Sequence, residues 1–304
     1  MRITSRLALL LTLPPLLWAG NAVVGRMAVG HVPPLALNAL RWVVATLMLL
    51  PLGWRVLASG RARADIAGRW RELALLGLLG VGAYNALQYL ALTTSTPLNV
   101  TLIAASSPLW MMGVGATLYR VRPRPRDWLG SALSLAGVVV VLSRGSAAAL
   151  ARVHFVPGDL LMLLAVASWA FYSWQLARPP ASMRGQARPD WNWAELLLVQ
   201  TLFGGTFAVM FAGVEAELTD ATIRWSPWVL LALLYVALGP SVIAYRCWGL
   251  GVAAVGPAVA AFFSNLTPLF AALLSAALLG AAPQPYHAVA FALIVAGIAV
   301  SARR

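Results

Sequence analysis

Long apolar runs, separated by short segments rich in arginine, proline or glycine, follow one another along the whole chain. A helix that crosses the hydrocarbon core of a membrane needs about 20 consecutive apolar residues. Runs of about this length cover residues 6–27, 35–57, 71–93, 97–119 and 128–143, then 159–177, 194–214, 228–249, 257–279 and 285–301. The pattern predicts an all-α polytopic membrane protein with ten transmembrane helices. We expect the first run to be a retained helix, because no clean A-x-A cleavage site follows it and further spans come after it.

The composition agrees with this fold class. The 304 residues are 61% hydrophobic and 10% charged, whereas a soluble domain has about a quarter of its residues charged. An ordinary soluble enzyme, a disordered tail protein and a fibrous repeat are therefore excluded. The single cysteine, Cys247, excludes an internal disulfide framework and a cysteine-based zinc site. We expect no cofactor and no metal.

The net charge of +13 is carried by arginine, which gathers in alternate loops. These loops follow the second, fourth and sixth runs and contain Arg55, Arg61, Arg63, Arg69 and Arg71, then Arg120, Arg122, Arg124 and Arg126, then Arg178, Arg184 and Arg188. The positive-inside rule places such loops, and with them both termini, in the cytoplasm. Anionic lipid headgroups suffice to explain the arginine clusters. We therefore expect the lipid bilayer, and not nucleic acid, as the partner of these clusters.

An internal repeat divides the chain into two halves. Pro97, Pro108-Leu109, Pro123-x-Pro125 and Gly137 recur 160 positions later as Pro257, Pro268-Leu269, Pro283-x-Pro285 and Gly297. Ala83-Tyr84 also matches Ala244-Tyr245, 161 positions later, and Trp18-Ala19 matches Trp169-Ala170, 151 positions later. The repeat predicts one five-helix unit over residues 1–145 and a second over 146–304. Because five is odd, the second unit is inverted relative to the first, which is the arrangement that supports alternating access in many secondary transporters.

Several motifs resemble a known family. They are Leu16-Leu17-Trp18-Ala19-Gly20-Asn21, then Pro33-Pro34 with Ala39-Leu40-Arg41-Trp42, and Gly158-Asp159-Leu160-Leu161 before Trp169. Over nearly the whole chain the sequence resembles EamA-type members of the drug/metabolite transporter superfamily. The length, the tryptophan-rich helices and Ser106-Ser107-Pro108-Leu109-Trp110 are most similar to the YddG-type exporters. This resemblance implies export of aromatic and other neutral amino acids across a bacterial inner membrane. We expect the protein to function as a monomer.

Polar and aromatic side chains within the runs are the candidates for a substrate site, because polar groups in hydrocarbon are costly unless they pair or face a cavity. Many share a helical face: Trp18 and Asn21 lie three residues apart, and Tyr84 and Gln88 four. We predict a central cavity lined by the first, third, fourth, sixth, eighth and ninth helices, which suits a substrate with a flat ring. The predicted substrate-binding residues are Trp18, Asn21, Tyr84, Gln88, Ser107, Trp110, Trp169, Tyr172, Tyr245 and Asn265. Pro108 and Pro268, near the middle of their runs, are predicted hinges.

Each candidate also has a purely structural interpretation. Intramembrane Asn and Ser often only join helices, tryptophan often anchors a helix at the membrane surface, and a proline can be an ordinary bend. Gly130, Gly137 and Gly297 indicate close helix packing. For Arg41 we favour a side chain that extends outward to the headgroups over one that projects into the cavity. Arg246 is expected to contribute to topology.

The acidic residues all fall in loops or at helix ends, so the sequence contains no obvious intramembrane proton carrier. This favours facilitated movement over proton coupling. Three other functions remain as alternatives. His154-x4-Asp159 has the spacing of an acyltransferase motif, although Pro157-Gly158-Asp159 is more typical of a helix start. A channel is the second alternative, and an exporter of drugs or other small metabolites is the third.

Overall fold

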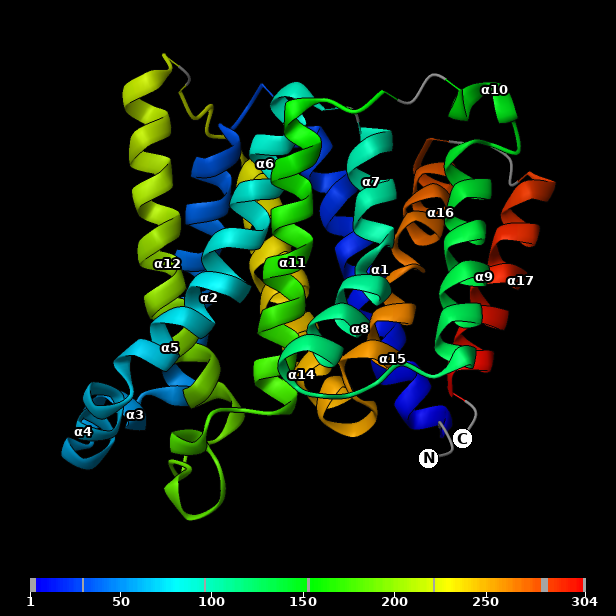
Figure 1. Ribbon diagram of the computed structural model, residues 1–304. Coiled ribbons are helices and arrows are strands. Elements are labelled where there is room, and N and C mark those ends of the chain that lie inside the picture. The colour runs from blue at the N-terminus through cyan, green and yellow to red at the C-terminus, as the bar shows by residue number, and fades with distance from the viewer. Residues whose placement is uncertain are drawn as a thin grey trace.

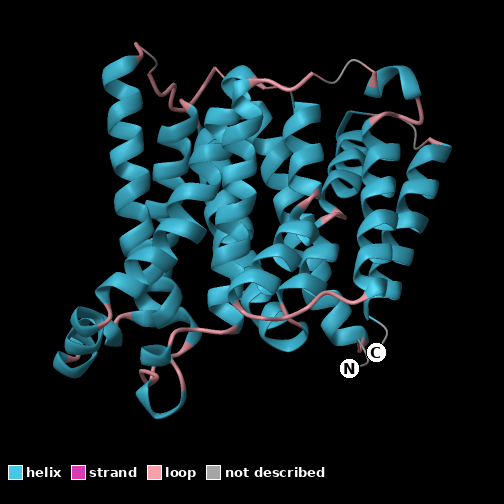
Figure 2. Ribbon diagram, in the orientation of Figure 1, coloured by secondary structure: helices cyan, strands magenta, loops and turns pink. Residues whose placement is uncertain are grey.

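The structure is a computed structural model that describes residues 4–28, 30–95, 97–151, 154–220, 222–279 and 284–302. Throughout this part of the chain the regular structure is helical and no strand occurs, as Figure 2 shows. The long helices run side by side and form a single bundle (Figure 1). The predicted all-α fold class is confirmed.

In six of the predicted runs one unbroken helix covers all or most of the run. They are α1 (Ser5–Ala28), α2 (Pro34–Gly53), α9 (Pro125–Leu142), α11 (Pro157–Ala177), α12 (Trp193–Leu218) and α17 (Pro285–Ala302). Four of the six begin with proline, which fits the first turn because the backbone N–H it lacks has no partner within the helix. Asp127, Asp159 and Glu195 then occupy the third helical position of α9, α11 and α12, where each carboxylate accepts the backbone N–H of the residue just before its helix. In α12 the Asn192 side chain also accepts the Glu195 N–H, which completes a capping box.

The third and eighth runs each contain a π-helix. The third consists of α5 (Trp70–Gly77), η1 (Leu78–Ala83) and α6 (Tyr84–Thr94). The eighth consists of α13 (Pro227–Val236), η4 (Ala237–Ile243) and α14 (Ala244–Val255). Each π-helix is followed by a tyrosine of the Ala-Tyr pair that the repeat matches. The two irregular segments therefore occur at related positions of the two predicted halves.

The fourth and ninth runs are broken near their prolines. The fourth forms α7 (Pro97–Ala105) and α8 (Ser107–Leu118), with a bend of 43° between residues 99–105 and α8. The ninth forms α15 (Pro257–Ser264) and α16 (Thr267–Leu279). Within the described ranges, nine helices are long and apolar enough to cross a membrane, and the bent α7–α8 pair makes a tenth candidate. This number agrees with the ten predicted runs.

The arginine-rich segments lie at the lower end of the bundle in Figure 1, where α1 begins and α17 ends. Here α3 (Arg55–Ala58) and α4 (Gly60–Gly68) lie near the short helices η2 (Ala181–Met183) and η3 (Gly185–Ala187). Arg69 connects them, because its guanidinium binds Asp65 Oδ1 at 2.6 Å and donates to the carbonyl oxygens of Ser182 and Ala187, each at 2.8 Å. The short helix α10 (Ala147–Leu150) lies at the opposite end.

Helices of the two predicted halves pack against one another throughout the bundle. The pairs in contact include α1 with α14, α6 with α11, α2 with α12, α8 with α15, and α9 with α17. The last pair is very close: a Cβ atom on Gly130 would lie 2.8 Å from the Gly297 carbonyl oxygen. The predicted role of Gly130, Gly137 and Gly297 in close packing is confirmed.

Candidate functional site

The two π-helices present backbone carbonyl oxygens to side chains of other helices. π-helical segments occur frequently at functional sites, because their hydrogen bonds are out of register with those of the surrounding α-helix. In η1 the Gly80 carbonyl oxygen accepts a hydrogen bond from the Tyr245 hydroxyl. In η4 the Pro240 carbonyl oxygen accepts one from the indole N–H of Trp18, at 3.1 Å. Each π-helix is thus tied to a residue of the predicted site.

Trp169, on α11, lies at the centre of an aromatic cluster between the two predicted halves. Its ring centroid lies 5.1 to 5.5 Å from those of Trp18, Tyr84, Tyr172, Tyr245 and Trp248. Rings at these separations attract one another. The six residues come from α1, α6, α11 and α14, and we call them the Trp169 cluster. Five of the predicted substrate-binding residues therefore meet in one place, although helical spacing alone had placed them only in separate pairs.

Close packing fixes the orientation of Tyr172 in this cluster. Its hydroxyl donates to Gln200 Oε1 on α12 at 3.1 Å, and its ring lies directly against the Gly80 backbone. A Cβ atom on Gly80 would overlap the ring, so this approach requires glycine. Trp248 is held in a similar way, because its indole N–H donates to Ser173 Oγ at 3.1 Å.

Two predicted amides, Asn21 and Gln88, lie next to the Trp169 cluster. Asn21 follows Trp18 by three residues on α1, and Gln88 follows Tyr84 by four on α6, so each lies one turn from a member of the cluster. Both side chains are half-buried. Within the described part of the chain neither forms a hydrogen bond. Neither amide therefore joins two helices within this part of the chain.

Other predicted site residues have local structural partners. Asn265 is buried and donates through Nδ2 to Ser134 Oγ on α9 at 2.8 Å. Ser107 donates to the Ala104 carbonyl oxygen at 2.6 Å, across the bend before Pro108. These contacts agree with the structural interpretation of the two residues.

Trp110 and Tyr84 both pack against a smaller apolar cluster that includes Met162 and Val166. Pro108 lies at the start of α8 and Pro268 at the start of α16, next to the two helix breaks. The hinge function of both prolines, like the binding function of every predicted site residue, stays a prediction.

Arg41 corrects one expectation. We favoured a side chain that extends outward to the headgroups, but only 2% of Arg41 is exposed. Its Nε donates to Ser241 Oγ in η4 at 2.5 Å, and Nη1 and Nη2 lie 3.5 Å from Asn85 Oδ1 and the Pro240 carbonyl oxygen. Hydrogen-bond partners in the interior, close to the Trp169 cluster, draw the guanidinium away from the membrane surface.

The buried carboxylates serve as helix caps. The Asp159 carboxylate accepts a hydrogen bond from the Val156 backbone N–H at 2.9 Å, and two more from the Ser95 hydroxyl and the Asn99 side-chain amide. These bonds agree with the predicted helix start. Asp127 and Glu195 accept the backbone N–H groups of Arg124 and Asn192 at 2.8 and 2.7 Å. Both carboxylate oxygens of Asp159 thus accept hydrogen bonds at the start of α11. This structural role accounts for Asp159 in the His154-x4-Asp159 spacing, and no catalytic role is needed.

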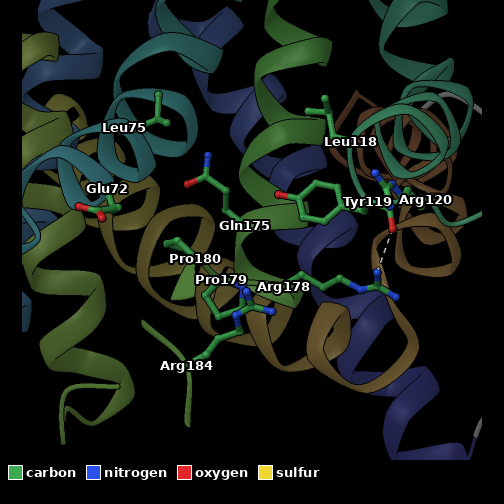
Figure 3. Close-up of a pocket in the computed structure, with 10 residues that line it drawn as sticks. All are labelled: Glu72, Leu75, Leu118, Tyr119, Arg120, Gln175, Arg178, Pro179, Pro180 and Arg184. Carbon is green, nitrogen blue, oxygen red and sulfur yellow. Dashed lines mark hydrogen bonds between the residues drawn. The ribbon is translucent and has the colours of Figure 1, made fainter. Parts of the chain in front are cut away.

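A cavity of about 780 Å³ opens at the lower, arginine-rich end of the bundle. Figure 3 shows the Glu72, Gln175 and Tyr119 side chains around it, together with Arg120, Arg178 and Arg184. Arg178 donates to the Tyr119 carbonyl oxygen at 3.1 Å. Burial raises the pKa of the Tyr119 phenol, and the positive charge of Arg178 partly offsets the rise. The cavity therefore has an excess of positive charge around a phenol that stays protonated at neutral pH.

Sequence reasoning missed several residues of this site. Trp248 shares its helical face with Tyr245 and Ser241, and this spacing was the signal that could have included it. Gln200 gave no such signal, because only the fold brings it to Tyr172. For Arg41 the sequence analysis weighs both directions and favours the wrong one. The signal for the interior is the position of Arg41, which lies seven residues inside α2, or about 10 Å from the start of the helix.

Comparison with known proteins identifies the family. The model of the EamA-like transporter family matches residues 5–143 and, separately, residues 156–303. The chain belongs to the EamA-like transporter family. The two matches together cover most of the chain.

Members of the EamA-like family with similar sequences carry transporter names. An Archaeoglobus fulgidus protein named an uncharacterized transporter is 26% identical over 294 residues, which are 97% of this chain and 96% of that protein. The aromatic amino acid exporter YddG of Ancylobacter novellus is 27% identical over 94% of this chain and 93% of its own. The uncharacterized inner membrane transporter YedA of Escherichia coli is 25% identical over 92% and 85%.

A crystal structure also shares the fold of this EamA-like protein. It has a TM-score of 0.73 and 26% identity, with coverage of 98% of this chain and 97% of that one. The resemblance to EamA-type transporters inferred from the sequence motifs is confirmed. The protein is a multi-pass membrane transporter and not an enzyme.

Proposed function

We propose that this EamA-like transporter exports neutral amino acids, aromatic ones among them, across a bacterial inner membrane. The observation that carries the proposal is the Trp169 cluster, in which six aromatic side chains from both predicted halves meet. The amides of Asn21 and Gln88, which form no hydrogen bond with a described residue, lie one helical turn from two of its members. Aromatic walls bind a flat apolar ring, and amides bind the polar groups of an amino acid. The likeness to the exporter named YddG supports this substrate class.

Alternating access is the proposed mechanism. The helix pairs α1–α14 and α6–α11 each join one predicted half to the other, and the Trp169 cluster lies where these four helices meet. If the halves are inverted repeats, rocking about this contact exposes the site to one side of the membrane and then the other. The two matches to the family model support the division into halves. Inversion, the boundary after residue 145 and cytoplasmic termini stay predictions.

We infer facilitated movement along the substrate gradient rather than proton coupling. A proton-coupled carrier needs a titratable group that alternates between proton and substrate. The buried carboxylates Asp127, Asp159 and Glu195 are engaged as caps at helix starts. Glu215 has a similar role, because its two carboxylate oxygens accept the Leu35 and Ala36 N–H groups at the start of α2. Net export then requires a higher substrate concentration in the cytoplasm.

Counterflow in proteoliposomes tests the proposal. Vesicles preloaded with unlabelled L-phenylalanine should accumulate labelled L-phenylalanine, and the initial rate should saturate with concentration, as expected for a carrier. A panel of neutral amino acids and cationic drugs then competes for uptake. The proposal expects aromatic amino acids to compete. Competition by drugs alone would favour the drug exporter, and a rate that never saturates would favour a channel.

A further inference from the structure

The helix α2 carries three polar groups on one buried face. The exposed fraction of Asn38, Arg41 and Trp42 is 0 to 2%. The helix that carries them is apolar enough to cross a membrane. Asn38 and Trp42 are one helical turn apart, which brings their Cβ atoms to about 5–6 Å. The Arg41 guanidinium carbon lies 5.0 Å from the centre of the Trp42 ring. The three side chains therefore form one continuous group, which we call the α2 triad.

Among the described residues, the hydrogen-bond partners of Arg41 are all neutral. These are the Ser241 hydroxyl and, at the long end of the hydrogen-bond range, the oxygens of Asn85 and Pro240. In the described ranges the ion pairs are Arg69–Asp65 and Arg124–Asp127, and neither includes Arg41. A buried charge is costly unless an opposite charge compensates it. A guanidinium has five N–H donors, so the three bonds above leave donors for an anion.

The other two members of the α2 triad add donors without partners. The indole nitrogen of Trp42 and both polar atoms of the Asn38 amide are buried, and none forms a hydrogen bond with a described residue. Buried polar groups in native proteins almost always have a partner. Asn38 and Trp42 both break this rule beside the Arg41 guanidinium, whose bonds to described residues are all to neutral groups. Together the three residues point to an anionic ligand that satisfies them.

The α2 triad also lies next to the Trp169 cluster. The Trp42 ring lies 5.2 Å from that of Tyr245, and Tyr245 in turn lies 5.5 Å from Trp169. An amino acid whose carboxylate binds the α2 triad can therefore place its own side chain against the Trp169 cluster.

We propose that Asn38, Arg41 and Trp42 form a subsite that binds the carboxylate of the substrate. The planar guanidinium matches a carboxylate with two parallel hydrogen bonds. The indole N–H and the Asn38 amide supply further donors, and the ring of the substrate then lies against the Trp169 cluster. This inference rests on the proposed function, and it deepens it: the carrier selects solutes with a free carboxylate and rejects purely cationic ones.

Thermal melting of the full-length protein in detergent separates the chemical groups. Three related probes are used: L-phenylalanine, 3-phenylpropionate, which keeps the carboxylate and lacks the amine, and phenethylamine, which lacks the carboxylate. We expect the first two to raise the melting temperature of the wild type and phenethylamine not to raise it. Equal stabilisation by phenethylamine, or by chloride at the same concentration, would overturn the carboxylate subsite.

Substitutions assign the effect to the triad. In Arg41→Gln we expect the affinity for 3-phenylpropionate to fall at least a hundredfold, while the ligand-free melting temperature stays the same or rises because an uncompensated charge has been removed. In Trp42→Phe, which keeps a ring and loses the N–H, the affinity should fall about tenfold. The control is Arg246→Gln, because Arg246 lies over Trp193, away from the triad. Unchanged affinity in both triad variants contradicts the proposal.

Transport measured on the same preparations distinguishes a failure of the carboxylate subsite from a failure of the proposed amino acid export. If Arg41→Gln carries L-phenylalanine as the wild type does, the subsite is wrong and amino acid export stands. If the wild type neither binds nor carries any amino acid, the proposed function fails and the subsite fails with it. If Arg41→Gln does not fold, the decision falls to Trp42→Phe and the three probes on the wild type.

Discussion

Trp18 on α1 donates its indole N–H to the carbonyl oxygen of Pro240, inside the π-helix η4, at a distance of 3.1 Å. A related contact occurs in the other predicted half, where Ser168 on α11 donates to the carbonyl oxygen of Leu79 in η1 at 2.7 Å. Leu79 and Pro240 occupy corresponding positions when Tyr84 is matched to Tyr245. In each case a helix of one half bonds to the irregular segment of the other, and this links the two halves at the site.

Replacing Trp18 with phenylalanine should weaken this link without removing the ring. The lost hydrogen bond is expected to lower the free energy of unfolding by about 1 kcal/mol, and the rate of amino acid counterflow should change. Trp128→Phe is the matched control, because 56% of Trp128 is exposed, and its stability should stay within about 0.5 kcal/mol of the wild type. Equal behaviour of the two variants would mean that the bond to Pro240 has no energetic role.

Gly80→Ala tests the packing of η1 against Tyr172. The added methyl group overlaps the tyrosine ring, so either the π-helix or the ring must move, at a cost of about 1–3 kcal/mol. We expect a lower melting temperature and reduced counterflow. Gly113→Ala, at a position where nothing lies within 4 Å of the new Cβ, should keep both properties. Wild-type transport by Gly80→Ala would argue against a fixed geometry at this contact.

Asn21 and Asn265 should respond oppositely to alanine. Asn265 joins α15–α16 to α9 through Ser134, so its loss is expected to lower stability by about 0.6 to 1.7 kcal/mol while folded protein still transports. Asn21 has no partner in the described part of the chain, so its loss should reduce transport at an unchanged melting temperature. A fall in stability for Asn21→Ala would instead support a helix-joining function.

Transport should be insensitive to a pH gradient. The buried carboxylates Asp127, Asp159 and Glu195 are held by backbone N–H groups at helix starts and are not available as carriers of protons. Collapsing the pH gradient at a constant L-phenylalanine gradient should therefore leave the initial rate unchanged. Uptake that stops when the pH gradient is removed would contradict facilitated movement.

The sequence predicts most of this architecture because two of its signals are strong. The first is the set of apolar runs, because a segment that spans a membrane has few alternatives to a helix. The second is helical spacing, which places Trp18, Tyr84, Trp169 and Tyr245 on faces that remain the same when the helices pack. The two π-helices could not be predicted from the sequence, because they depend on tertiary contacts such as that between Gly80 and Tyr172.

The orientation of a long side chain cannot be predicted from the sequence for the same reason: it depends on tertiary contacts. Arg41 has enough reach for the membrane surface or the interior, and the choice depends on Ser241, which lies 200 positions later in the chain. Asn265 likewise has its partner, Ser134, on a helix that is remote in sequence. Sequence patterns identify such polar residues, but only the packed bundle distinguishes a group that joins helices from one that is left for a substrate.

The central claim is that the Trp169 cluster holds the ring of the substrate between the two halves. A crystal structure with 4-iodo-L-phenylalanine tests it most directly, because anomalous scattering locates the iodine independently of the protein. We predict one anomalous peak beside Trp169, among Trp18, Tyr84 and Tyr245. A peak only in the cavity near Arg178, or no peak at a ligand concentration that saturates counterflow, would contradict the claim.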